Sequence, residues 1–120
     1  MIRRLLVKCT CGTDAPERAN QALTVAATAV AAGAEVDLWL TGEGAWLAVP
    51  GRAAGLVLEH ATPAADLLDA VLAAGSVTVC TQCAARRGLG VQDLIEGVRI
   101  AGSAAFVETA LRPDVQALVY

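Results

Sequence analysis

Aromatic side chains and basic charge are both scarce in this chain, and together these scarcities exclude one class of partner. The aromatic residues are Trp39, Trp46, Phe106 and Tyr120. Nine lysines and arginines are outnumbered by twelve aspartates and glutamates, so the formal net charge is −3. Proteins that bind nucleic acids normally carry a basic excess or aromatic stacking platforms. We therefore expect no nucleic-acid partner.

Long uncharged apolar runs are also absent, although 56% of the residues are apolar. A membrane-spanning helix needs about 20 consecutive apolar residues, and the longest candidate, residues 22–34, is shorter. The apolar run that follows Arg3 and Arg4 ends at Lys8, too soon for a signal peptide. These features predict a cytoplasmic protein with no membrane contact. So much apolar surface with few charges predicts a homo-oligomer.

Short apolar runs alternate with helical segments along the chain. Strands are expected at residues 3–8, 35–40, 77–79 and 115–120, with 56–58 and 98–100 as either short strands or loops. Longer helices are expected at about 14–32, 62–74 and 103–110, and shorter helical pieces at 45–48, 80–88 and 91–96. This alternation predicts one α/β domain, residues 1–120, whose sheet has about five mostly parallel strands and helices on both faces.

The ends of the first two long helices carry recognisable signals. Thr13 or Asp14 is expected to cap the first helix, with Pro16 in its first turn and Gly33 at its end. The pair Thr62-Pro63 is expected to serve as the cap and first turn of the second.

The four cysteines are spaced as Cys9-x-Cys11 and Cys80-x-x-Cys83. Structural disulfides are rare in cytoplasmic proteins, so metal binding or thiol chemistry explains them better. Cys80 follows the β-branched run 77–79, which places it at the carboxyl end of a strand, where reactive groups collect in α/β sheets. Arg86 and Arg87 follow closely, and cationic neighbours favour a thiolate. The alternative for Cys80 is an inert, buried cysteine.

Cys83 has two competing interpretations. It is either the resolving partner of Cys80 in a C-x-x-C redox pair or one of several metal ligands. If the strands at 3–8 and 77–79 are neighbours, Cys9, Cys11, Cys80 and Cys83 converge on a tetrahedral zinc or iron site. The alternative to a shared site is two unrelated pairs of small side chains. The single histidine, His60, is expected in a loop.

Residues 80–88 resemble the DsrE/DsrF/TusD family of sulfur-relay proteins. The motif is a strand that ends in cysteine, then small residues, then Arg86-Arg87-Gly88. Residues 94–98 and 102–107 and the last apolar strand are similar to the closing pattern of that family. The resemblance implies a flavodoxin-like layered fold, trimers or hexamers, and a persulfide on Cys80 that is received from a protein donor and passed to a protein acceptor.

Two features depart from that family pattern. Cys83 stands where a small residue is usual, and Cys9 and Cys11 add thiols to the first loop. Three hypotheses follow: a sulfur carrier, sulfurtransferase-like in its chemistry, with Cys80 and Cys83 as catalytic candidates supported by Arg86 and Arg87; a four-cysteine metal or thiol-redox protein of the same fold; and a non-catalytic subunit of an assembly.

Overall fold

The computed structural model of this chain describes residues 3–120 and contains one parallel sheet. Its strands are β1 (Arg4–Cys9), β2 (Glu35–Leu40), β3 (Ser76–Cys80), β4 (Arg99–Ala101) and β5 (Val115–Val119). Their order across the sheet is β4-β3-β2-β1-β5, and each neighbouring pair is parallel. The predicted α/β class and the flavodoxin-like layering are confirmed. Of the two uncertain segments, 98–100 contributes a strand, whereas 56–58 forms a loop in which Leu56 is buried.

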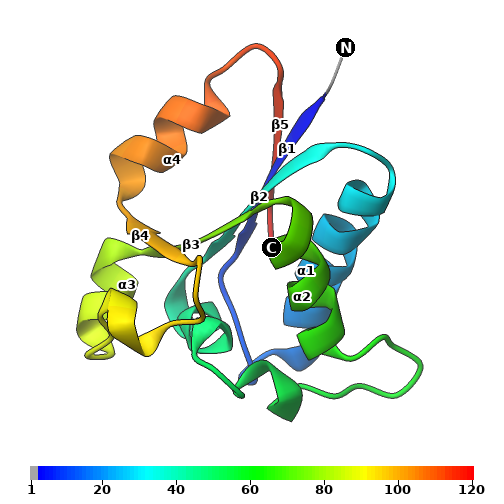
Figure 1. The fold of residues 1–120 in the computed structure, drawn as a ribbon, viewed down its shortest axis with the longest axis vertical. Coiled ribbons are helices and arrows are strands. Elements are labelled where there is room, and N and C mark those ends of the chain that lie inside the picture. The colour runs from blue at the N-terminus through cyan, green and yellow to red at the C-terminus, as the bar shows by residue number, and fades with distance from the viewer. Residues whose placement is uncertain (1–2) are drawn as a thin grey trace.

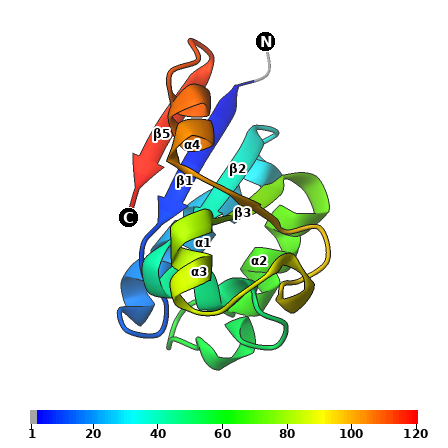
Figure 2. The same ribbon diagram turned by 90° about the vertical axis from the view of Figure 1, so that its left-hand side faces the viewer.

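Helices cover both faces of the sheet. The α-helices are α1 (Pro16–Ala31), α2 (Ala64–Ala74), α3 (Thr81–Arg86) and α4 (Ser103–Ala110). Three 3₁₀ helices, η1 (Gly42–Ala48), η2 (Ala53–Gly55) and η3 (Val91–Asp93), lie in the connections. Figures 1 and 2 show α1 and α2 on one face and α4 on the other, with α3 at the carboxyl end of β3. Within residues 3–120, no helix is long and apolar enough to cross a membrane.

The two faces of the sheet have different chemistry because successive side chains of a strand point to opposite sides. The face under α1 and α2 is apolar and closely packed, and its buried side chains include Val7, Val36, Leu38, Val77 and Val79. The face under α4 carries polar side chains, including Lys8, Asp37 and Thr78. The main hydrophobic core therefore lies on one side of the sheet, and the other side, where Leu6 and Trp39 are buried, also carries the polar side chains of a candidate site.

The predicted helix ends are partly wrong at the amino termini. Ala15 is the cap residue of α1, while the Asp14 carboxylate instead accepts a hydrogen bond from the Gly12 amide at 2.8 Å and closes the preceding turn. Pro63, not Thr62, caps α2. The carboxyl end of α1 is as predicted, because Gly33 follows it with a φ of +91°, a conformation that favours glycine.

The expectation that the first and third strands are neighbours is wrong. β2 lies between β1 and β3, so their carboxyl ends are about 10 Å apart at two strand spacings. The segment that follows β2, η1, fills the space between the two cysteine-bearing loops: the Gly42 amide donates to Cys83 Sγ, and Gly44 lies against the carbonyls of Cys9 and Cys11. A side chain at Gly44 would collide with those carbonyls, which explains the glycine there.

Candidate functional site

Cys80 lies where the sequence predicts it, at the carboxyl end of a buried strand. It is the last residue of β3 and the cap residue of α3, and its side chain is partly exposed. The β-branched residues Val77, Thr78 and Val79 form the buried strand, and the following small residues allow a tight helical turn. The thiol is therefore held by rigid elements while it remains open to reactants.

The surroundings of Cys80 favour its thiolate form. Burial by itself raises the pKa of the Cys80 thiol, but hydrogen bonds from the Cys83 amide and thiol and from the Gln82 amide more than offset it. The positive charge of Lys8 acts in the same direction. The pKa of Cys80 is consequently below the ordinary thiol value of 9.0.

Cys80 opens into a small pocket between the sheet and α4. This Cys80 pocket has a volume of about 250 Å³, and Lys8, Trp39 and Phe106 are among its lining residues. Trp39 and Phe106 pack edge to face with ring centroids 5.3 Å apart, and the Lys8 ammonium lies 5.0 Å from the Phe106 centroid. The walls are thus largely apolar with one cation, an environment suited to a polarisable sulfur anion.

The two predicted supporting arginines do not act alike. Arg87 binds the Glu43 carboxylate through two nitrogens, at 2.8 and 3.0 Å, and donates to the Cys83 carbonyl at 3.1 Å. These bonds tie the end of α3 to η1 and so help to fix the helix that begins at Cys80. Arg86 is exposed in the last turn of α3. Lys8, rather than either arginine, is the cation that lowers the pKa of Cys80.

Cys83 is a buried neighbour of Cys80. Its sulfur accepts a hydrogen bond from the Gly42 amide at 3.1 Å, and its thiol donates toward Cys80. Cys83 is 8% exposed, so external reactants reach Cys80 more easily. Of the two cysteines of the C-x-x-C motif, Cys80 is therefore the more accessible.

Cys9 and Cys11 do not join this site. Cys9 is in register with Leu40, which pairs with Val79, so it belongs to the apolar face of the sheet and not to the face of the Cys80 pocket. The Cys9 thiol donates to the Cys11 carbonyl at 3.1 Å, and burial raises its pKa to about 12. Over residues 3–120, no three Cys, His, Asp or Glu side chains are grouped as metal ligands. The arrangement gives the predicted four-cysteine zinc or iron site no support.

Sequence reasoning missed the effect of Lys8 on Cys80 and the hydrogen bond from the Gly42 amide of η1 to Cys83. Lys8 interrupts a buried apolar strand, and its alternation with Val7 and Cys9 shows that it faces the opposite side of the sheet. That signal is readable, but nothing local joins Lys8 to Cys80. His60 is exposed in a loop, as predicted, and Trp46 stacks on Arg52 at 4.6 Å from its ring centroid.

Thiol labelling of the native protein is expected to be strongly selective. At pH 8, iodoacetamide should modify Cys80 first, because a pKa of about 12 leaves only about one Cys9 thiol in 10⁴ ionised. The rate of Cys80 modification should rise with pH and then level off, and the midpoint of this rise should lie below pH 9.0. Peptide mass spectrometry gives the order of labelling, and denatured protein, in which all four cysteines react, is the control. Equal rates for Cys9 and Cys80 would contradict these assignments.

Comparisons with known proteins agree with this fold. A family model of DsrE/DsrF-like proteins matches residues 4–115. The uncharacterised protein MJ0989 of Methanocaldococcus jannaschii is 37% identical over 93 residues, which are 74% of this chain and 78% of that protein. The uncharacterised protein MK0008 of Methanopyrus kandleri is 36% identical over 86 residues, which are 71% of this chain and 68% of that protein.

Two solved structures share the architecture. The E. coli protein YchN superposes with a TM-score of 0.80 over the full length of both chains at 19% identity. MTH1491 of Methanobacterium thermoautotrophicum, a protein of unknown function, superposes with a TM-score of 0.74 over 98% of this chain and 99% of its own at 9% identity. At these identities the likeness shows a common fold.

Proposed function

Because the chain belongs to the DsrE/DsrF-like family, we propose that it is a sulfur carrier that holds a persulfide on Cys80. The observation that carries the proposal is the thiol itself: Cys80 is partly exposed at a strand end, and its pKa is lowered by the Cys83 and Gln82 hydrogen bonds and by Lys8. A thiolate is the nucleophile in sulfur exchange. The Cys80 pocket would shield the bound sulfur from water.

The proposed transfer needs no oxidant. The Cys80 thiolate attacks the terminal sulfur of a donor persulfide, a new sulfur–sulfur bond forms, and the donor leaves as a thiolate. An acceptor thiolate then attacks the terminal sulfur on Cys80 and regenerates the free thiol. The experiment is incubation with a persulfide donor followed by intact-mass analysis, in which one added sulfur atom per chain supports the proposal. We propose protein partners as donor and acceptor, in the cytoplasm.

A thiol-redox function is the second candidate, favoured by Cys83, which lies one helical turn after Cys80 and helps to lower the pKa of the Cys80 thiol. In that case, the Cys83 thiolate would attack the inner sulfur of a persulfide formed on Cys80, the outer sulfur would leave as hydrosulfide, and an internal disulfide would remain. The two functions differ in the stable product: a persulfide for the carrier and a disulfide for the redox protein. Treatment with the donor followed by alkylation distinguishes them, because the disulfide leaves Cys83 unlabelled after unfolding and the persulfide leaves it free.

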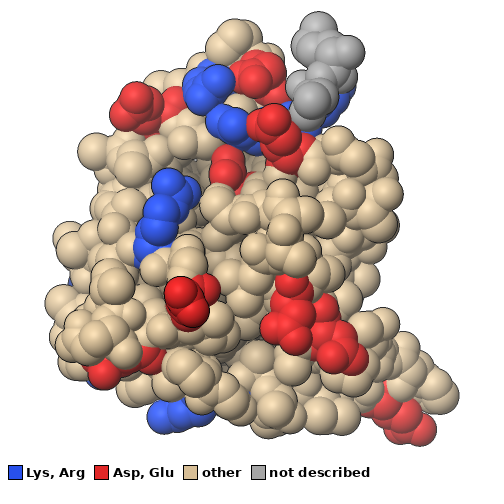
Figure 3. All heavy atoms as spheres, viewed as in Figure 1, with Lys and Arg blue, Asp and Glu red and all other residues tan. Residues whose placement is uncertain are grey.

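We also propose that the chain forms a homo-oligomer, a trimer or hexamer. α4 has no buried residue, and its Val107 and the C-cap residue Leu111, four positions later, are 49% and 78% exposed. The edge strand β5, which α4 contacts, adds Val119 at 64% exposure. Figure 3 shows that charged side chains cover only a minor part of the visible surface. Such apolar surface is typical of an interface.

Light scattering at micromolar concentration should therefore give a mass several times 12.2 kDa. Leu111→Asp should lower that mass by placing a charge in the apolar interface. Val57→Asp is the matched control, because Val57 is similarly exposed, at 70%, but lies in the loop before α2. A mass of 12.2 kDa for the parent protein, or equal effects of both substitutions, would refute this interface.

A further inference from the structure

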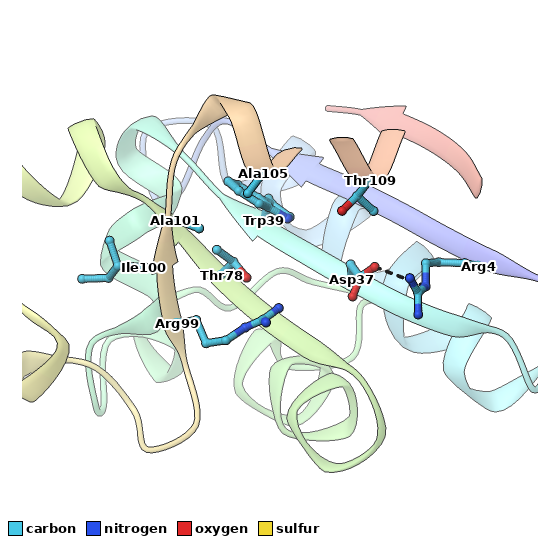
Figure 4. A pocket seen from close by; sticks show the side chains of 9 residues that line it. All are labelled: Arg4, Asp37, Trp39, Thr78, Arg99, Ile100, Ala101, Ala105 and Thr109. Atoms are coloured by element: carbon cyan, nitrogen blue, oxygen red, sulfur yellow. Dashed lines mark ion pairs between the residues drawn. The ribbon is translucent and has the colours of Figure 1, made fainter. Parts of the chain in front are cut away.

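A second pocket lies on the same face of the sheet, beside the Cys80 pocket. This β4-side pocket has a volume of about 440 Å³ and is drawn in Figure 4. Trp39 lines both pockets. The β4-side pocket also reaches Ala101, the register partner of Cys80 on the neighbouring strand. A molecule bound there would therefore lie next to Cys80, the residue proposed to carry the sulfur.

One buried polar atom in the lining of this pocket has neither a hydrogen-bond partner nor an ion-pair partner. Within residues 3–120, Arg4 Nε and Thr78 Oγ1 are the buried side-chain polar atoms that have no hydrogen-bond partner, but Arg4 Nε forms an ion pair with Asp37 at 3.6 Å. Both Arg4 and Thr78 line the β4-side pocket, and Thr78 is 1% exposed. A buried polar group without a partner destabilises a fold. The Thr78 hydroxyl therefore leaves a hydrogen bond that a polar ligand in this pocket would supply.

The charged side chains divide the pocket into two ends. Arg99 of β4 is exposed and, within residues 3–120, forms no ion pair; Figure 4 shows its guanidinium beside Thr78. At the other end, Asp37 accepts a hydrogen bond from Ser76 at 2.6 Å and lies 3.6 Å from Arg4 Nε. An arginine fork suits a carboxylate, and Asp37 suits an ammonium group. The pocket thus matches a small zwitterion of the amino-acid type.

We infer that the β4-side pocket binds the carboxylate of a small amino-acid persulfide and presents its terminal sulfur to Cys80. This inference rests on the proposed sulfur transfer. Thr78 and Cys80 are two residues apart on one face of β3, a separation of about 6.6 Å. The carboxyl carbon and terminal sulfur of cysteine persulfide are about 5 Å apart when extended. A carboxylate held by Arg99 and Thr78 would therefore place that sulfur within reach of the Cys80 thiolate.

The reaction is a balanced exchange. The Cys80 thiolate attacks the terminal sulfur, the donor sulfur–sulfur bond breaks, and its electron pair leaves on the inner sulfur as the cysteine thiolate. The proton of the terminal sulfur stays with that sulfur on Cys80 or passes to the leaving thiolate. No net oxidation or reduction occurs.

Two donors distinguish the pocket from the general reactivity of Cys80. Cysteine persulfide has the carboxylate, and the inorganic disulfide anion lacks it. Arg99→Gln should slow the rate of persulfide formation with cysteine persulfide roughly tenfold, the effect of losing one charge-assisted hydrogen bond, and leave the rate with inorganic disulfide unchanged. Arg18→Gln on the opposite face is the matched control and should change neither rate. Equal slowing with both donors, or no slowing, would overturn the inference.

A binding measurement separates failure of the pocket from failure of the sulfur carrier. S-methylcysteine cannot transfer sulfur, and Trp39 fluorescence in a Trp46→Phe background reports on its binding. Binding should survive Cys80→Ser and weaken roughly tenfold in Arg99→Gln. Thr78→Val should also weaken it without lowering the melting temperature, because the lost hydroxyl has no partner in the free protein. If S-methylcysteine does not bind, the pocket assignment is wrong whether or not Cys80 accepts sulfur.

Discussion

Replacing Cys80 with serine should slow the addition of sulfur from a persulfide donor by more than about a hundredfold, because a serine hydroxyl is not ionised at neutral pH and is a far weaker nucleophile. The side chain is partly exposed and serine is nearly the same size, so the fold should be retained. Intact-mass analysis over time gives the rate, and circular dichroism confirms folding.

Cys83→Ser is the matched control for that substitution. Cys83 lowers the pKa of Cys80 through hydrogen bonds from its amide and its thiol, and serine keeps the amide and supplies a hydroxyl. The Cys83 variant should therefore still accept one sulfur atom, at a rate within a few-fold of the parent. Equal loss of sulfur addition in both variants would favour the redox pair over the carrier. Unchanged sulfur addition in Cys80→Ser would refute the carrier function.

The second large effect concerns Cys9 and alkaline stability. The thiol ionises at about 9.0 when exposed, but burial raises its pKa to about 12 in the folded protein. Between these two values the unfolded chain releases a proton that the folded chain retains, so the free energy of unfolding falls as pH rises. One such group contributes a slope of about 1.4 kcal/mol per pH unit. Below pH 9 this contribution is fully stabilising and independent of pH.

Urea unfolding of the parent and of Cys9→Ala measures this linkage. From pH 9 to 10.5, the parent should lose about 2 kcal/mol more than the variant, which has no thiol to ionise at that position. Cys80→Ser should keep the alkaline loss of the parent, because the pKa of Cys80 is lowered rather than raised. Parallel pH profiles for the parent and Cys9→Ala would show that Cys9 is not held protonated by burial.

The sequence predicts the local features of this site better than it predicts which distant segments come together there. The β-branched run before Cys80 and the small residues after it act over a few residues, so the strand end and the start of α3 are readable. The lateral order of strands depends on packing between distant segments, and nothing local shows that β2 separates Cys9 from Cys80. The expected four-cysteine site depends on β1 and β3 being neighbours, and the sequence does not show that they are separated.

The electrostatics of Cys80 show the same division. Arg86 and Arg87 are close to Cys80 in the sequence, yet Arg87 forms an ion pair with Glu43 of η1. The cation that lowers the pKa of the Cys80 thiol is Lys8 of β1. Lys8 reaches this face because alternation along β1 turns it away from the core, a signal that the sequence contains. Its pairing with the Cys80 pocket needs the register of three strands, which only the structure supplies.

The most direct test of the carrier function is to locate the added sulfur in the unmutated protein. After brief exposure to a persulfide donor and alkylation, cleavage after lysine and arginine leaves Cys9 and Cys11 in the peptide 9–18 and Cys80 and Cys83 in the peptide 53–86. Fragmentation within the second peptide then separates its two cysteines. We predict one additional sulfur atom on Cys80 and none on Cys9, Cys11 or Cys83. Sulfur found on another cysteine while Cys80 remains a free thiol, or on no cysteine at all, would contradict the proposed function.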